Sequence, residues 1–236
     1  NLDDEWVVKA YEAAFSSPPP TTTYSVEGRS ADVQVHHRSM DPLTGALQID
    51  LAIQGNRQKL ELPLFGLHQA SNIAAASSAA LLFGVPAREI LERLPVLKST
   101  SQRGELIGLS DGKTLVDESY NSNPAALIAS LTSVAQLDPT RRRVLILGEM
   151  RELGEFSSAQ HARAGKALVE LYRAKKFPFL LVGVGNGFLP FLLEVEKELP
   201  GVPCMGVPDT SHAIQRLKSL ILPGDIFLVK GSRGIQ

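Results

Sequence analysis

The chain has 236 residues, of which 44% are hydrophobic and 21% charged, and its net charge at neutral pH is −1. This composition indicates one large or two small folded domains, and it excludes a disordered segment and a strongly basic nucleic-acid-binding protein. Cys204 is the only cysteine, which excludes an internal disulfide and favours a reducing compartment such as the cytoplasm. The longest apolar runs are too short to span a membrane.

The first 98 residues predict an α/β region that carries antiparallel strands. Residues 5–15 are expected to form a helix, and the Pro/Ser/Thr-rich residues 16–23 a linker. Apolar side chains then alternate along three segments, as in a meander of antiparallel strands. An alanine-rich helix closed by Gly84 follows, and Pro86 opens a further helix. The strand segments are residues 31–37, 46–53 and 59–64, and the two helices are residues 69–83 and 86–94.

Beyond about residue 98, strands alternate with helices, beginning with two strands joined by an Asp111-Gly112 turn. This alternation predicts a doubly wound α/β sheet, because each crossover helix must cover a face of the sheet. We therefore expect an α/β chain in two parts, residues 1–98 and residues 99–236. The predicted strands of the second part are residues 105–109, 114–118, 144–147, 179–182, 204–207 and 226–229. The predicted helices are residues 125–137, 158–173, 188–199 and 211–220.

Residues 117–124 are the most informative segment, since carboxylate, hydroxyl and amide side chains lie there between a predicted strand and a predicted helix. Pro124 suits the first helical position, and Asn123 or Ser122 is able to cap the free N–H groups of that helix. A carboxylate and several amides at a strand-to-helix switch are typical of a ligand-binding ledge in an α/β sheet. The alternative is a well-capped loop without a ligand.

Several other segments resemble functional motifs only in part. Residues 112–114 lack the upstream glycine of a phosphate-binding loop, and a strand rather than a helix follows them. Residues 183–187 lack the third glycine of a dinucleotide loop and predict a flexible turn. His36 and His37 have no partners at metal-ligand spacing and are expected at the surface, and residues 141–143, three arginines, predict a solvated turn.

Six short elements occur in order along essentially the whole chain: residues 1–4, 66–72, 102–104, 116–124, 147–154 with His161, and 228–233. Among them, Ser-Tyr-Asn-x-Asn-Pro begins at Ser119, and Gly-x-Met-x-Glu-Leu-Gly begins at Gly148. Taken together, these elements resemble those of the Mur ligase family. The two quoted elements favour the member that adds D-alanyl-D-alanine.

The resemblance implies a domain organisation. Mur ligases have a uridine-nucleotide domain, a central ATPase domain and a C-terminal Rossmann-like domain. Residues 1–98 would be the end of the central domain, with its antiparallel flap, and residues 99–236 the C-terminal domain. We expect the chain to be a fragment, because no methionine precedes Asn1 and the family's phosphate-binding loop and magnesium ligands would lie upstream of it.

The resemblance further implies an ATP-dependent ligase of peptidoglycan precursor synthesis. In the family reaction, the substrate carboxylate and ATP form an acyl phosphate, which the amine of D-alanyl-D-alanine attacks. The dipeptide is thereby added to UDP-N-acetylmuramoyl-tripeptide. ATP and Mg²⁺ are the implied cofactors, and this fragment is expected to be inactive alone. Its partners would be these small molecules, with no nucleic acid and no membrane span.

The resemblance assigns two groups of binding residues, and it assigns no catalytic residue and no metal ligand. Glu118 stands where the family has a ribose-facing aspartate, Gln69 replaces the usual asparagine, and Glu152 and His161 match landmarks without an assignable role. The implied ATP-binding residues are Asn72, Arg103, Asp117, Glu118, Tyr120 and Asn121. The implied substrate-binding residues are Asn123, Lys230, Ser232 and Arg233. The alternative roles are helix caps, an exposed linker arginine and a solvated C-terminal turn.

Three other functions stay open at this point. One is a sister Mur ligase that adds meso-diaminopimelate or lysine, one is a folylpolyglutamate synthase, and one is a non-catalytic nucleotide- or peptide-binding module. The two enzymes would carry different residues at positions 120–124. A phosphate-binding loop encoded upstream of Asn1 would support a ligase, whereas a start codon there would favour the module.

Overall fold

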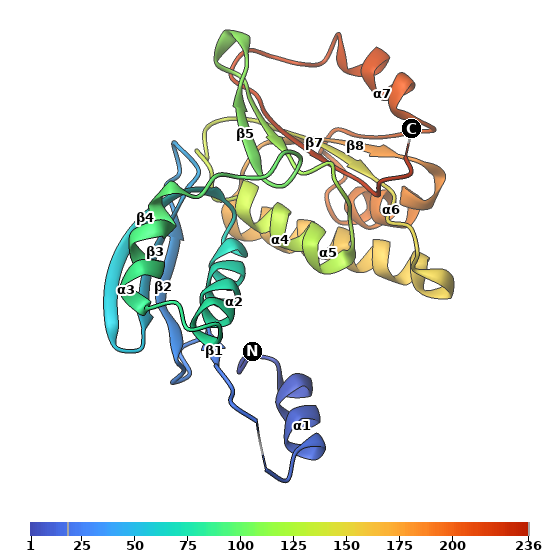
Figure 1. Cartoon of the computed structure of the whole chain (residues 1–236). Coiled ribbons are helices and arrows are strands. Elements are labelled where there is room, and N and C mark those ends of the chain that lie inside the picture. The colour runs from blue at the N-terminus through green and yellow to red at the C-terminus, as the bar shows by residue number, and fades with distance from the viewer. Residues whose placement is uncertain (18, 236) are drawn as a thin grey trace. The chain divides into compact units, whose positions relative to one another are not determined.

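The computed structural model describes residues 1–17 and 19–235. The chain forms two compact units, Asn1–Lys98 and Ser99–Gln236, whose elements are labelled in Figure 1. Over the described residues, the first unit contains a four-stranded sheet and the second a six-stranded sheet. That the first unit is the end of an ATPase domain stays a prediction.

Helix α1 (Glu5–Ala14) forms where the sequence predicted a helix. The Asp4 carboxylate accepts hydrogen bonds from the backbone N–H groups of Trp6 (3.0 Å) and Val7 (3.2 Å), which satisfies two of the donors that a helix start leaves free. Every residue of α1 is at least partly exposed. Packing within the unit therefore contributes little to the stability of this helix, and its cap contributes correspondingly more.

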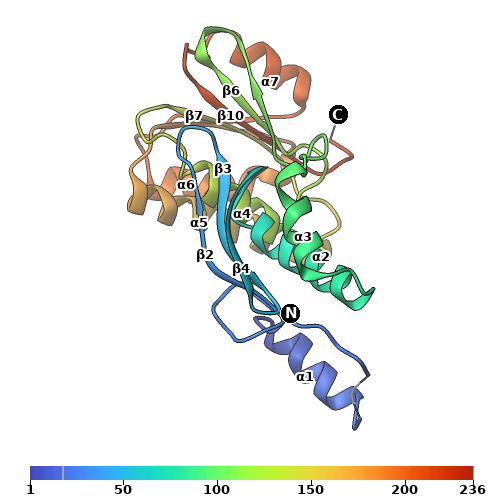
Figure 2. The ribbon, with the colours of Figure 1, turned by 60° about the vertical axis from the view of Figure 1, so that its left-hand side comes forward.

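The predicted meander is confirmed as β2 (Val33–Met40), β3 (Ala46–Ile53) and β4 (Asn56–Phe65), which pair antiparallel (Figure 2). Alternate side chains of β3 enter the core because successive residues of a strand point to opposite faces. A short strand β1 (Tyr24–Ser25) pairs parallel with β2. The sequence did not predict β1, since two residues after a proline-rich linker carry no alternation.

Two predicted helices of the first unit are confirmed as α2 (Gln69–Leu82) and α3 (Ala87–Arg93). Both contribute buried residues to the same apolar core as β2, β3 and β4. The buried face of α2 carries the small residues Ala70 and Ala74 beside Ile73, so this helix is able to approach the sheet closely.

The second unit has the predicted doubly wound α/β architecture. Its strands, in spatial order, are β5 (Glu105–Gly108), β6 (Thr114–Asp117), β10 (Ile226–Lys230), β7 (Arg143–Gly148), β8 (Phe179–Val184) and β9 (Cys204–Val207). All neighbours pair parallel except β5 and β6, which form the predicted antiparallel hairpin. Strand β10 follows the other strands in sequence but lies between β6 and β7, near the middle of the sheet.

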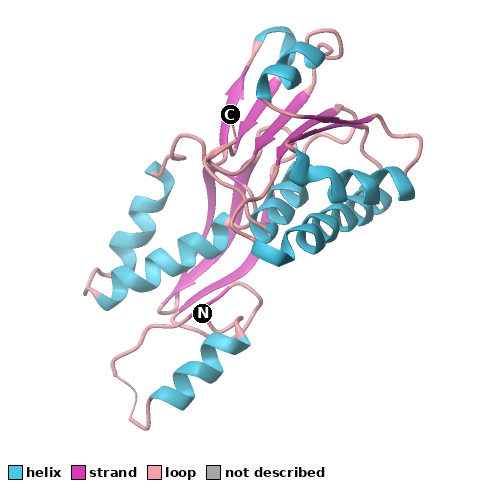
Figure 3. Cartoon of the chain, turned by 90° about the vertical axis from the view of Figure 1, so that its right-hand side faces the viewer, coloured by secondary structure: helices cyan, strands magenta, loops and turns pink. Residues whose placement is uncertain are grey.

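Helices cover both faces of this sheet (Figure 3). On one face lie α4 (Pro124–Val134), α5 (Ser157–Lys175) and α6 (Leu189–Glu198), and on the other lies α7 (Thr210–Leu217) (Figure 1). The chain steps from β6 through β7 and β8 to β9 in one direction, and α7 leads it back to β10. Right-handed crossovers therefore put α7 opposite the other three helices.

The predicted solvated turn at residues 141–143 is wrong. The Arg141 Nε donates to the Gly224 carbonyl at 2.7 Å, and the Arg142 guanidinium pairs with the buried carboxylate of Asp225 at 2.7 Å. These arginines connect the segment before β7 to the segment before β10. The run of charges concealed this role, since arginine has enough donors to satisfy several backbone carbonyls at once.

Arg143 is the most deeply buried of the three, with 0% of its surface exposed. Its guanidinium donates to the carbonyls of Val134 (3.3 Å) and Leu137 (2.6 Å), and also to that of Arg141. Val134 is the last residue of α4, where a cation is favourable, and Leu137 follows three residues later. Burial lowers the pKa of Arg143 to about 10, so the side chain is still charged at neutral pH.

Replacement of Arg143 by Met is expected to lower the free energy of unfolding of the second unit by roughly 2–4 kcal/mol, because buried carbonyls lose their donor. Urea unfolding followed by NMR signals of that unit measures the effect. The matched control is Arg163→Met on the exposed side of α5, which should change the stability by about 0.5 kcal/mol or less. Similar losses for both variants would contradict the role given to Arg143.

Candidate functional site

The carboxyl ends of β6, β10 and β7 meet at one edge of the second sheet. Val229 pairs with Asp117, and the Glu118 N–H donates to the Val229 carbonyl at 3.0 Å. Glu118 and Lys230 therefore leave their strands as neighbours. Ligands of open α/β sheets bind outside this edge, which makes it the candidate site.

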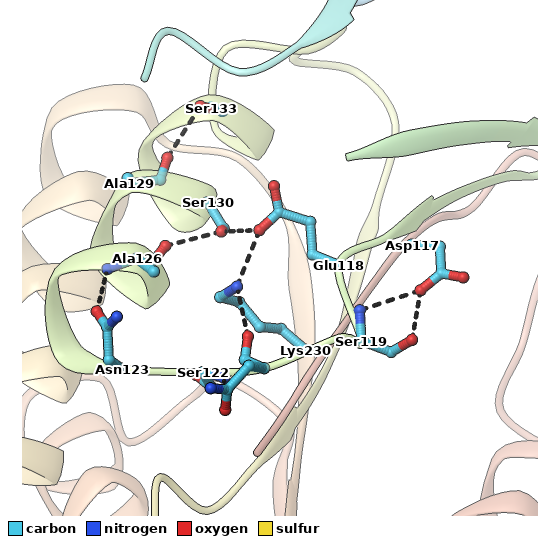
Figure 4. A network of polar contacts seen from close by, with 11 residues as sticks. Asp117, Glu118, Ser119, Ser122, Asn123, Ala126, Ala129, Ser130, Ser133 and Lys230 are labelled. Atoms are coloured by element: carbon cyan, nitrogen blue, oxygen red, sulfur yellow. Dashed lines mark hydrogen bonds and ion pairs between the residues drawn. The ribbon is translucent and has the colours of Figure 1, made fainter. Parts of the chain in front are cut away.

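A buried ion pair joins β6 to β10 at this edge (Figure 4). The Glu118 and Lys230 side chains are each 6% exposed, and Lys230 Nζ lies 3.1 Å from Glu118 Oε2. The same carboxylate oxygen accepts a hydrogen bond from Ser130 Oγ of α4. Because an isolated charge is unfavourable in a buried position, each group depends on the other. The contact of Glu118 with a ribose stays a prediction, and the carboxylate already has these internal partners.

The loop after Glu118 leads directly into α4. The Asp117 carboxylate accepts hydrogen bonds from the backbone N–H (3.0 Å) and the hydroxyl (2.6 Å) of Ser119. Of the two predicted caps, Asn123 is the one observed, since its Oδ1 accepts from the Ala126 N–H at 2.8 Å. Pro124 occupies the first helical position, as predicted. The ledge, defined here as residues 119–123, is thus fixed at both ends by local hydrogen bonds.

Tyr120, Asn121 and Asn123 are the exposed side chains of the ledge. Tyr120 is 38% exposed, and the Cζ atoms of Arg103 and Arg233 lie 3.9 Å and 5.7 Å from its ring centroid. Both distances are within the range of cation–π interactions. Within the described part of the chain, neither guanidinium forms an ion pair with a carboxylate. Aromatic, amide and guanidinium groups together suit an organic anion such as a nucleotide.

The segment after β7 fills the glycine-rich turn that follows β8. Glu149 Oε2 accepts a hydrogen bond from the Gly187 N–H at 2.9 Å, and Glu149 Oε1 lies 3.2 Å from Arg151 Nε. A Cβ atom at Gly187 would lie 2.7 Å from Glu149 Oε2, so a side chain there would displace the carboxylate from its present position. The Glu149 carboxylate thus accepts a hydrogen bond from a backbone N–H group of the turn that precedes α6.

His161 acquires a structural role that the sequence did not indicate. It is fully buried in α5, and its Nε2 accepts a hydrogen bond from the Met150 N–H at 2.9 Å. Its Nδ1 lies 2.8 Å from the Ser157 carbonyl, which assigns the ring proton to Nδ1. The ring also packs edge-on against Phe188. His161 therefore anchors the segment after β7, whereas Glu152 is exposed and its role stays unassigned.

Asn72 belongs to the first unit. It is the fourth residue of α2, it is exposed, and its Nδ2 donates to Gln69 Oε1 at 3.0 Å. Because Asn72 lies inside the helix rather than before it, its alternative role as a helix cap is not supported. The two amides form one exposed polar group, and Gln69 retains the amide chemistry of the asparagine that it replaces.

The residues of the ledge fit an organic ligand better than a metal ion. Over residues 1–17 and 19–235, no group of three or more His, Cys, Asp or Glu side chains is arranged to hold a metal ion. The buried Ser122 hydroxyl has no hydrogen-bond partner within the described chain, so the ledge retains a polar group for a ligand or a water molecule. Among the helices of the described residues, none combines the length and the apolarity that crossing a membrane requires.

His161→Phe is expected to lower the free energy of unfolding of the second unit by about 2–3 kcal/mol. A phenyl ring occupies a similar volume, but the Met150 N–H loses its acceptor and the Ser157 carbonyl loses its side-chain donor. Urea unfolding followed by NMR signals of that unit measures the change. His37→Phe, at an exposed position of β2 in the first unit, is the control. It should change the free energy of unfolding of the second unit by about zero. An equally small effect at both positions would show that His161 does not anchor the segment.

Comparisons with known proteins agree with this architecture. The UDP-N-acetylmuramoyl-tripeptide–D-alanyl-D-alanine ligase of Mycobacterium leprae is 29% identical over 211 residues, which are 83% of this chain and 38% of the relative. The ligase of the same name from Escherichia coli K12 is 35% identical over 179 residues, which are 73% of this chain and 36% of the relative. The chain thus spans less than half the length of these curated relatives.

Solved structures show the same fold. A crystal structure of MurF from Acinetobacter baumannii matches with a TM-score of 0.76 and 24% identity, over 98% of this chain and 48% of that chain. MurF from Thermotoga maritima in complex with ADP matches with a TM-score of 0.75 and 18% identity, over 99% of this chain and 49% of that chain. The family described as Mur ligase, glutamate ligase domain, matches residues 102–233, which is more than half of the chain. The chain therefore belongs to the Mur ligase family.

Proposed function

We propose that the chain is part of an ATP-dependent ligase that adds D-alanyl-D-alanine to UDP-N-acetylmuramoyl-tripeptide in peptidoglycan precursor synthesis. The observation that carries this proposal is the exposed group of Tyr120, Asn121 and Asn123 beside Arg103 and Arg233. This group lies at the ligand-binding edge of a Mur ligase fold. The relatives of 29% and 35% identity, which bear this ligase name, support the choice of substrate.

The proposed reaction has two steps. The tripeptide carboxylate attacks the γ-phosphorus of ATP, which forms an acyl phosphate and releases ADP. The free amine of D-alanyl-D-alanine then attacks the acyl carbon, the C–O bond to phosphate breaks, and the amine loses a proton as the amide forms. Such chemistry depends on positioning and on stabilisation of charge more than on a protein nucleophile, in agreement with a site of amides and arginines.

The exposed residues divide between the two ligands. On the nucleotide side we place Arg103, Tyr120 and Asn121, with Asp117 near them, and on the dipeptide side Asn123 and Arg233. Asn72 of the first unit is proposed to read the adenine. The solved complex of a Thermotoga maritima MurF with ADP supports a nucleotide site in this fold.

Magnesium and location are part of the same proposal. Mg²⁺ is the metal ion proposed to accompany ATP, and no residue of this chain is proposed as its ligand. The cytoplasm is the expected location, because ATP and a nucleotide-linked peptide are its substrates. Burial raises the pKa of the Cys204 thiol to about 11, so the thiol is protonated at neutral pH.

The intact gene product is expected to release phosphate from ATP only when both UDP-N-acetylmuramoyl-tripeptide and D-alanyl-D-alanine are present. A phosphate-release assay with each substrate omitted in turn measures this dependence. Lysine or meso-diaminopimelate with UDP-N-acetylmuramoyl-dipeptide as the acceptor tests the sister ligases, and glutamate with a folate acceptor tests folylpolyglutamate synthase. Turnover with one of these amines but not with the dipeptide would identify that alternative, and no turnover with any of them would favour a binding module.

Asn72→Ala in the intact gene product is expected to raise the KM for ATP about fivefold to tenfold, since one hydrogen bond to the base is lost. The KM for D-alanyl-D-alanine should change by less than about twofold. Steady-state kinetics with each substrate varied in turn gives both values. Gln58→Ala, an exposed amide on β4, is the control and should leave both unchanged. Equal increases in the two KM values would contradict an adenine role for Asn72.

A further inference from the structure

The segment that follows β10 contains two kinds of residue. Lys230 and Ser232 are buried, with 6% and 7% of their surfaces exposed, whereas Arg233 is exposed. We propose that Lys230 and Ser232 are positioning residues, which hold the ledge in the form that receives a ligand, and that Arg233 alone of the three contacts the ligand. We call residues 230–232 the clamp. Its effect on ligands rests on the proposed function, but its effect on the ledge does not.

The clamp holds two consecutive carbonyl groups of the ledge. Lys230 Nζ donates to the Asn121 carbonyl at 3.0 Å, and Ser232 Oγ donates to the Ser122 carbonyl at 3.4 Å. The partners are 109 and 110 residues apart in sequence, so these are tertiary contacts rather than part of a local turn. With both carbonyls fixed, the side chains of Tyr120 and Asn123 on either side have a defined direction.

The clamp also joins the ledge to the segment after β7. Ser232 Oγ accepts a hydrogen bond from the Arg151 N–H at 2.8 Å, and the Ser232 N–H donates to the Glu149 carbonyl at 3.3 Å. Between them, a Cβ atom at Gly231 would lie 3.2 Å from the Gly148 Cα, so glycine permits the two strand ends to approach. The clamp thus connects the ends of three strands.

Charge explains why a lysine serves in the clamp. A charged donor forms a stronger hydrogen bond with a carbonyl than a neutral one does, and the buried position strengthens it further. The Glu118 carboxylate compensates the charge of Lys230 at 3.1 Å, and Ser130 holds the carboxylate from α4 (Figure 4). Glu118 is therefore the counter-ion of the clamp.

Hydrogen–deuterium exchange of the chain, without any ligand, tests the clamp. The double variant Glu118→Gln/Lys230→Met removes both charges together, so no unpaired buried charge remains. We expect exchange in peptides that cover residues 118–124 to become about tenfold faster, while exchange in β8 stays unchanged. Ser232→Ala, a milder change, should accelerate the same peptides in the same direction. Arg233→Gln, the matched control in the same segment, should change exchange by less than about twofold.

Binding of ADP and of D-alanyl-D-alanine, measured by titration calorimetry, separates positioning from contact. Both the double variant and Arg233→Gln should weaken the binding of at least one ligand about tenfold, but only the double variant should also accelerate exchange. Unchanged exchange in both Ser232→Ala and the double variant would overturn the clamp. Weaker binding with unchanged exchange would show that Lys230 contacts the ligand directly, which also overturns it. If the unaltered chain binds neither ligand, the proposed function loses support, and the exchange experiment still decides the clamp.

Discussion

The position of β10 between β6 and β7 is the constraint on which the carboxyl edge of the second unit depends. A parallel strand carries its own end, and the residues just beyond it, to the same edge as its neighbours. In this way Lys230 comes beside Glu118, and Ser232 comes beside the segment after β7, although long stretches of chain separate them. Right-handed crossovers then send α7 to the opposite face from α4, α5 and α6, so that both faces of the central strands are covered.

Buried cations donate to backbone carbonyls at both ends of the parallel strands: Arg143 begins β7, and Lys230 ends β10. Arg143 donates hydrogen bonds to carbonyls at and just after the end of α4, and Lys230 donates one to a carbonyl of the ledge. Their surroundings differ: Lys230 has a carboxylate 3.1 Å away, whereas the Arg143 guanidinium contacts backbone carbonyls and the ring of Phe177, whose centroid lies 5.1 Å from Cζ. Water is largely excluded from both positions, so each hydrogen bond is stronger there than at the surface and its loss is more damaging. Such a framework restricts the motion of the exposed side chains that it supports, which reduces the entropy lost when a ligand binds.

Much of the fold could be predicted from the sequence, because its signals are local. Alternating leucines predicted the β3–β4 hairpin, and apolar strands separated by helical repeats predicted the parallel sheet. The sequence predicts Asn123 or Ser122 as the N-cap of α4, and Asn123 is the cap observed. The prediction is wrong where partners are distant in sequence. The run of arginines predicts a solvated turn, because the sequence does not show which carbonyls Arg143 contacts. In the candidate site, the residues of the ledge could be predicted because they are adjacent in sequence. The pairing of Glu118 with Lys230 could not be predicted, because it depends on strand order. The nucleotide and dipeptide contacts themselves stay predictions.

Strand β10 also determines when the second unit is able to fold during synthesis. It pairs on both sides, with β6 and with β7, and it is translated after every other strand of the sheet. Until residue 230 has left the ribosome, β6 and β7 lack the neighbour that separates them, and their facing edges offer unpaired N–H and C=O groups. Folding of the unit therefore waits for β10 to be translated, and it depends on contacts between residues that are distant in sequence. A nascent chain that ends before β10 would leave these two strand edges open to pairing with other chains.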